Sequence, residues 1–226
     1  MMSSYQEQGY ILHRRAFRER SCLVDFFGET FGKQRIVLPV TKSTKALLQP
    51  FVYLSLNVRG KSDLKNGSQV EALGKAEDLQ GYFLYSAFYV NELIQYVVED
   101  YEPLPQLFEL YQKTLSALSL KRDLESTLRL FEAEFLSLSG YGIDFENDIN
   151  GEKILPDCRY RFVSEFGFQF VSGDENLGFS GESLMAISNN DYQLLSTKKS
   201  AKQIFRQAIN TLLDGRKLKS RQLFSQ

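Results

Sequence analysis

Basic side chains gather near the end of the chain, where their chemistry suits the binding of a polyanion. The stretch GRKLKSRQLF places four cations within six positions: Arg216, Lys217, Lys219 and Arg221. Lysine and arginine bind phosphate groups through charge and hydrogen bonds. The stretch is therefore either a solvated terminus without a role or part of a surface that holds a polyanion.

A second group of cations lies near the start of the chain, interleaved with aromatic residues. The cations are Arg14, Arg15, Arg18, Arg20, Lys33, Arg35, Lys42 and Lys45, and the aromatic residues are Tyr10, Phe17, Phe31 and Tyr53. Proteins that hold single-stranded nucleic acid combine cations along the phosphates with aromatic faces on which bases stack. The pattern favours strand binding, with the alternative that Phe17 and Phe31 are core residues.

The formal net charge of -1 hides a segregated distribution. Residues 1–80 carry 12 Lys and Arg against 8 Asp and Glu, residues 81–196 carry 7 against 19, and residues 197–226 carry 8 against 1. Segregated basic surface indicates a polyanionic partner more directly than total charge does. One alternative is that this charge distribution only keeps the protein soluble. The other is that the cations of residues 197–226 pair with the acidic residues of 81–196.

Residues typical of an enzyme are sparse. No GxxxxGK[ST], HExxH or GxSxG motif occurs, and one histidine, His13, is present. Two cysteines, Cys22 and Cys158, are too few for the usual four-ligand zinc site. The acidic residues in 99–102 could hold Mg²⁺ for phosphodiester cleavage, but a solvated helix end beside Pro103 is favoured. The sequence predicts no catalytic residue, metal or cofactor.

The chain also lacks the features of a membrane or secreted protein. No run approaches the ~20 apolar residues that span a bilayer. The polar start MMSSYQEQGY has no apolar segment of the kind found in signal peptides. We therefore expect a cytoplasmic protein with no membrane partner.

Alternating hydrophobicity in the first 80 residues predicts strands. Residues Val52, Leu54, Leu56 and Val58 share one face of a predicted strand. Strands are predicted within residues 9–17, 21–27, 33–40, 51–58 and 68–78. A turn is expected at KNG (residues 65–67), before the last of them. Five short strands joined by tight turns are typical of a small barrel.

The hydrophobic period changes to that of helices after Gly81. Helices are predicted within 82–100, 106–120, 123–140 and 198–215. The last of these aligns Lys198, Lys202 and Arg206 in one row. An alternating stretch around Gly167 predicts a small hairpin within residues 159–172.

The order of these pieces resembles the RecO family of bacterial recombination mediators over nearly the whole chain. The resemblance rests on LVDFFGETFGKQRIV, LLQPFVYLSLNVRGKSDL, LYSAFYVNELI, RLFEAEFLSLSGYGIDF and the terminal LKSRQLF. It implies an α+β protein with a five-stranded OB-fold barrel over residues 1–80. A helical domain with the small hairpin insertion follows over 81–226.

The resemblance also implies a function without catalytic turnover. RecO proteins bind single- and double-stranded DNA and anneal complementary strands coated with single-strand-binding protein (SSB). With RecR, and often RecF, they help load RecA, so a nucleoid-associated cytoplasmic protein is expected. Many members hold zinc through four cysteines, but here residues 142–181 contain Cys158 alone. The alternatives are an interaction scaffold without DNA affinity and a metal-dependent nuclease.

A partner site is implied for the acidic C-terminal tail of SSB, whose free carboxylate suits a guanidinium group. Arg129 matches the arginine of the family's motif, with Lys121 and Arg122 as second choices. The alternative is that Arg129 pairs with Glu125 or Glu132 on its own helix. Among the terminal cations, Lys217 and Arg221 are assigned to DNA, and the Lys198–Lys202–Arg206 row to internal pairing.

Overall fold

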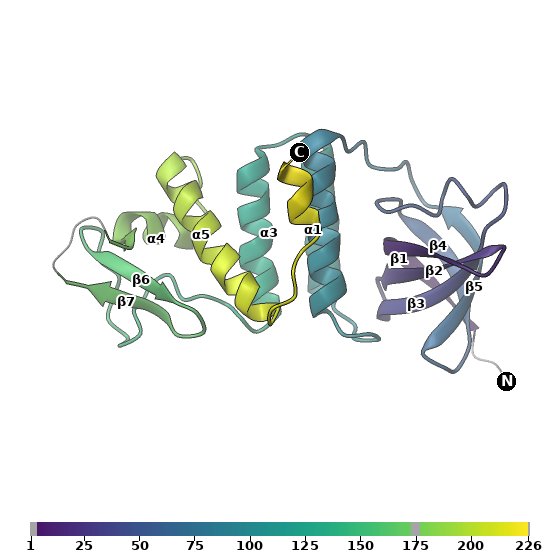
Figure 1. Ribbon diagram of the computed structural model, residues 1–226, viewed down its shortest axis with the longest axis horizontal. Helices are drawn as coiled ribbons and strands as arrows, with labels where there is room; N and C mark the ends of the chain where they lie inside the picture. Colours follow the sequence, from purple (N-terminus) through teal and green to yellow (C-terminus); the bar gives the residue numbers. More distant parts are fainter. Residues whose placement is uncertain (1–3, 173–176, 226) are drawn as a thin grey trace. The chain divides into compact units, whose positions relative to one another are not determined.

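The computed structural model describes residues 4–172 and 177–225. The chain forms two compact units, which are described separately. The first unit contains residues 1–121 and 218–226, and the second contains residues 122–217. The last residues therefore return to the unit in which the chain begins. Figure 1 labels the helices and strands.

The first unit begins with a closed five-stranded barrel in the order β1-β2-β3-β5-β4, which confirms the predicted barrel. Its strands are β1 (Ser4–Phe17), β2 (Ser21–Gly28), β3 (Gly32–Pro39), β4 (Leu54–Arg59) and β5 (Leu64–Ala72). β3 and β5 pair in parallel, and the other neighbours pair antiparallel. Alternate residues such as Val24, Phe26, Ile36 and Leu38 fill the interior and are fully buried. This alternation explains why the strand period was readable in the sequence.

The turn predicted at residues 65–67 is wrong, because these residues lie inside β5. The connection from β4 instead runs through residues 60–63. A Cβ atom at Gly67 would lie 2.3 Å from a methyl carbon of Leu38 and 2.9 Å from one of Ile36. Glycine is therefore required here for close approach to β3, and not for a turn.

Two helices, α1 (Gly81–Val97) and α2 (Pro105–Ser119), pack on the outside of the barrel. Asn91 of α1 donates from Nδ2 to the carbonyl oxygen of Leu12 at 3.0 Å, and accepts from the Tyr111 hydroxyl at 2.7 Å. Phe27 of β2 contacts the rings of Phe108 and Tyr111. Burial raises the pKa of Tyr111 well above its ordinary value. The outer surface of β1 and β2 is therefore partly a helix-packing surface.

The second unit combines helices with a small sheet. The helices are α3 (Leu124–Leu138), α4 (Gly181–Ser188) and α5 (Leu195–Leu212), and the sheet has the order β7-β6-β8. β6 (Arg159–Val163) and β7 (Gly167–Val171) form the predicted hairpin, which is confirmed. α4 and the short β8 (Phe179–Ser180) were not predicted from the sequence. Both are too short to show a clear hydrophobic period.

The N-terminus of α3 depends on Asp123. Its Oδ1 accepts from the backbone N–H of Ser126 at 2.7 Å, and its Oδ2 lies 2.7 Å from Lys198 Nζ of α5. The Lys198 ammonium, with further help from Ser126, lowers the pKa of Asp123 to about 2. One carboxylate thus caps α3 and ties it to α5.

Replacing Asp123 by alanine is expected to lower the free energy of unfolding by about 1 kcal/mol, the usual contribution of a helix N-cap. Because the folded pKa is depressed, this contribution is present above about pH 4, the unfolded value, and is lost as the pH falls toward 2. Urea unfolding of both proteins at pH 7 and pH 3 measures it. A difference that is the same or larger at pH 3 would contradict this assignment.

Candidate nucleic-acid interface

The end of the β1–β2 hairpin carries four of the predicted DNA-binding residues: Arg14, Arg15, Arg18 and Arg20. Arg14 lies opposite Val24 and Arg15 opposite Leu23, and residues 18–20 form the turn. All four side chains are exposed. Within the part of the chain that the structure describes, none of them forms an ion pair with a carboxylate. Their positive charge is therefore available to a phosphate backbone.

The segment between β3 and β4 carries Lys42 and Lys45, both exposed. It runs through consecutive turns and is anchored by Leu48, which is fully buried in the barrel core. Arg14 donates from Nη1 to the carbonyl oxygen of Leu48 at 3.0 Å. This hydrogen bond ties the lysine-bearing segment to the hairpin arginines.

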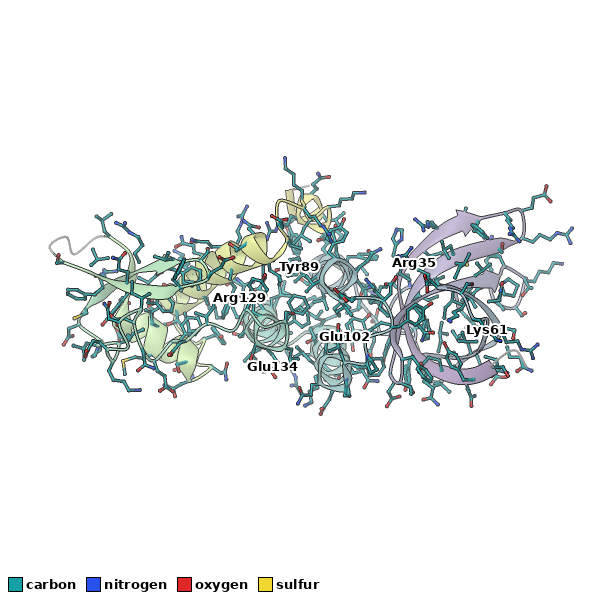
Figure 2. All side chains as sticks on the ribbon, turned by 90° about the horizontal axis from the view of Figure 1, so that it is seen from below. Arg35, Lys61, Tyr89, Glu102, Arg129 and Glu134 are labelled. Atoms are coloured by element: carbon teal, nitrogen blue, oxygen red, sulfur yellow. The ribbon has the colours of Figure 1, made fainter. Side chains whose placement is uncertain are left out.

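Lys33 and Arg35 lie on β3, but both meet the carboxylate of Asp100. Lys33 Nζ lies 3.3 Å from Asp100 Oδ1, and Arg35 Nη2 lies 2.8 Å from Oδ2. Lys33 also donates to the carbonyl oxygen of Gln95 at 2.9 Å, and its side chain is only 12% exposed. Arg35 remains accessible on the barrel (Figure 2). The positive charge of β3 is therefore partly neutralised within the protein.

The same contacts correct the interpretation of residues 99–102 as a solvated helix end. The backbone N–H of Tyr101 donates to the carbonyl oxygen of Lys33 at 2.8 Å, so this segment docks on the first residues of β3. Its central carboxylate is the counter-ion of two barrel cations. Across residues 4–172 and 177–225, no cluster of three or more His, Cys, Asp or Glu side chains is arranged to hold a metal ion.

The turn between β4 and β5 adds cations that the sequence analysis missed. Arg59 and Lys61 are exposed, and Figure 2 labels Lys61. Lys65 lies over the ring of Tyr101, with Nζ 5.0 Å from the ring centre. In OB folds the β1–β2 and β4–β5 loops are the usual sites of oligonucleotide binding. The signal in the sequence is the group of three cations, Arg59, Lys61 and Lys65, around residues 60–63.

The four candidate stacking residues have different surroundings. Tyr10 is 7% exposed and packs against Tyr53 and Tyr111, so it is a core residue. Burial and a hydrogen bond to Glu29 raise the pKa of Tyr53 to about 12. Phe17 is half-buried, and Phe31 is 40% exposed. Phe31 is therefore the most accessible stacking surface of the four.

A buried carboxylate holds the loop that carries Phe31. Glu7 is 1% exposed and accepts from the backbone N–H groups of Thr30 and Phe31 at 3.1 Å and 3.0 Å. Phe31 also packs on the ring of Tyr5, with centroids 4.4 Å apart. The β2–β3 loop is thus held in a defined conformation.

In the second unit, Arg129 of α3, labelled in Figure 2, forms an ion pair with Glu132. Nε lies 2.7 Å from Oε2, and Nη2 donates to Oε1 at 2.9 Å. The two side chains are 7% and 5% exposed. Arg129 therefore pairs with Glu132 on its own helix, which was the alternative to binding the SSB tail. The pair is buried and not exposed. Lys121 and Arg122, the second choices for the SSB tail, are both exposed.

The cation row of α5 is partly engaged within the second unit. Lys198 pairs with Asp123 at 2.7 Å, and Lys202 lies 3.8 Å from Glu125. Internal pairing of these two lysines is confirmed. Lys217 is exposed, and Arg221 lies half-buried in the C-terminal 3₁₀ helix η1 (Ser220–Ser225).

A closed five-stranded barrel with cations on two of its loops, followed by helices, places this chain among OB-like barrel proteins, a class in which these loops often bind oligonucleotides. Two family descriptions match the chain: "Recombination protein O N terminal" over residues 2–75 and "Recombination protein O C terminal" over residues 80–222. The chain belongs to the RecO family of DNA repair proteins.

Similar proteins span almost the same length. DNA repair protein RecO of Haemophilus influenzae strain Rd is 39% identical over 230 residues, which cover 100% of this chain and 98% of that protein. DNA repair protein RecO of Pseudoalteromonas atlantica is 39% identical over 232 residues, covering 100% and 96%. The Pseudomonas putida protein of the same name is 37% identical over 219 residues, covering 96% of each. The family supports a role in DNA repair and recombination, and these relatives carry no enzyme name.

Among the described helices, none combines the length and apolar character needed to cross a membrane.

Proposed function

We propose that this protein binds single- and double-stranded DNA through its barrel and anneals complementary single strands. The observation that carries the proposal is the group of exposed hairpin arginines without carboxylate partners among the described residues. Two phosphate backbones repel each other, and a cationic surface that holds both lowers this barrier. No base-specific contact is required, so binding is independent of sequence.

The partners proposed from the family are SSB, RecR, RecF and RecA. SSB-coated strands are the substrate for annealing, and RecR, with RecF in some settings, acts with this protein in loading RecA. The SSB tail needs a cation beside an apolar surface. Because Arg129 is already engaged by Glu132, a tail carboxylate would have to displace Glu132 or bind the exposed Lys121 or Arg122.

The function is tested by annealing two labelled complementary oligonucleotides, bare and SSB-coated, over a range of salt concentrations. We expect faster annealing with the protein. The logarithm of the affinity for single strands should fall with the logarithm of salt with a slope of about -0.7 per phosphate contact. A matched oligonucleotide pair of scrambled sequence should anneal with the same acceleration.

Two results would reject the proposal. Weak, salt-independent binding without annealing would favour the interaction scaffold. Shortening of the labelled strands on a denaturing gel after addition of Mg²⁺ or Mn²⁺ would favour the nuclease.

A further inference from the structure

Three aromatic residues from distant parts of the chain meet in the first unit. Tyr82 and Tyr85 lie at the start of α1, and Phe224 lies in η1. The rings of Tyr82 and Phe224 are nearly parallel, with an angle of 11° and centroids 6.3 Å apart. Tyr85 stands edge-on to both rings. Tyr82 is 58% exposed and Phe224 is 37% exposed, so the cluster is not a core.

The C-terminal segment is held against α1 by one carboxylate. Glu92 accepts from the backbone N–H groups of Lys219 and Ser220 at 2.8 Å and 2.9 Å, and from the Ser220 hydroxyl at 2.6 Å. Leu218 and Ser220 are buried. In Figure 1 the final turn of the chain lies beside α1. The position of Phe224 over α1 is therefore built into the fold.

The charge around this cluster suits a phosphate backbone. Lys219 is exposed beside the anchor, and Arg221 lies one turn before Phe224 in η1. Neither η1 nor the first turn of α1 contains an acidic residue. The N-cap residue of α1, Gln80, makes no side-chain cap and donates from Nε2 to Asp78 Oδ1 at 3.0 Å, so the positive charge near the cluster comes from the C-terminal segment. Exposed aromatic faces next to cations are what unpaired bases and their phosphates require.

We propose that Tyr82 and Phe224 form a stacking platform for the bases of single-stranded DNA, distinct from the barrel loops. The inference rests on the proposed strand-binding function and adds a second point of contact. Tyr82 and Phe224 contact bases, and Glu92 is a positioning residue that acts through the C-terminal segment. Stacking needs unpaired bases, so the platform selects single strands over duplex.

The first test is Tyr82→Ala, measured by fluorescence anisotropy with labelled oligo(dT) and with a duplex of equal length. Affinity for oligo(dT) should fall about tenfold, in the range found for loss of one base–aromatic stack. The salt slope and the duplex affinity should not change, because no phosphate contact is removed. Phe170→Ala is the control, since Phe170 is an exposed aromatic residue in the second unit, 49% exposed.

The second test uses the absence of tryptophan from this chain. Tyr82→Trp introduces a single tryptophan, which can be excited selectively over the tyrosines of the chain, and stacked thymine bases should quench its emission on addition of oligo(dT). Phe170→Trp should not be quenched. Glu92→Gln should weaken oligo(dT) binding less than Tyr82→Ala does, because Tyr82 remains in place.

The outcomes separate the platform from the barrel. Unchanged oligo(dT) affinity in Tyr82→Ala, with no quenching in Tyr82→Trp, overturns the platform while leaving barrel binding intact. Loss of affinity together with a flatter salt slope also overturns it, because that result indicates a phosphate contact. Failure of the unaltered protein to bind oligo(dT) overturns both the platform and the proposed function.

Discussion

Replacing Arg15, Arg18 and Arg20 together by alanine is expected to weaken single-strand binding about 100-fold at 0.1 M salt. Each lost phosphate contact removes about 0.7 from the slope of log affinity against log salt concentration. At 0.1 M salt, three lost contacts therefore lower the affinity by roughly two orders of magnitude. The slope itself should become less steep by about 2. Because these side chains are exposed at a turn, stability should change little. The measurement is fluorescence anisotropy with oligo(dT) from 0.05 to 0.4 M salt.

Arg35→Ala provides a matched comparison from the same barrel. Arg35 is accessible, but Asp100 lies 2.8 Å from its guanidinium and partly neutralises it. Its removal should change the salt slope clearly less than removal of one hairpin arginine. If Arg35→Ala changed the salt slope as much as the loss of one hairpin arginine, the ion pair with Asp100 would not limit the contribution of Arg35 to binding. An unchanged slope in the triple variant, with a folded protein, would place the strand elsewhere.

The parts of the fold that were predicted from sequence are those governed by local period. Val24, Phe26, Ile36 and Leu38 alternate because these positions face the barrel interior, and this pattern is visible without a structure. Glycine was less informative. Gly67 serves close packing inside β5, and the sequence does not distinguish this role from that of a turn.

The parts of the site that were not predicted depend on contacts between distant residues. The sequence shows Lys33 and Arg35 as cations but not Asp100, some 65 positions away, which pairs with both. Likewise, Glu92 holds a segment that lies 128 positions further along the chain. Charge counting along the sequence therefore overstates the free positive charge on β3, and it does not reveal the Tyr82–Phe224 pair.

Arg129→Ala is expected to destabilise the protein by about 3–5 kcal/mol, the usual cost of removing one partner of a buried ion pair. The sequence predicted Arg129 as a ligand of the SSB tail or as the partner of Glu125 or Glu132, and burial of the Glu132 pair makes its loss costly. The pair is 7% and 5% exposed, so the variant would leave the Glu132 carboxylate buried without its counter-ion. Urea unfolding of both proteins measures the loss of unfolding free energy, provided that the dependence of this free energy on urea concentration (the m-value) is the same in both. A change below about 1 kcal/mol would show that the pair is solvated in solution.

The double variant Arg129→Met with Glu132→Leu separates the role of the pair from the role of Arg129 in binding. Replacing both partners by apolar side chains of similar volume is often neutral for stability, so this protein should unfold near the wild-type urea midpoint. Calorimetry with an SSB tail peptide can then be done on a folded protein. If the peptide binds the double variant with wild-type affinity, Arg129 is structural and the exposed Lys121 and Arg122 become the candidates. If peptide affinity is lost while affinity for bare DNA is unchanged, the tail carboxylate binds Arg129 by displacing Glu132. The Arg129–Glu132 ion pair is then the form of the site without peptide.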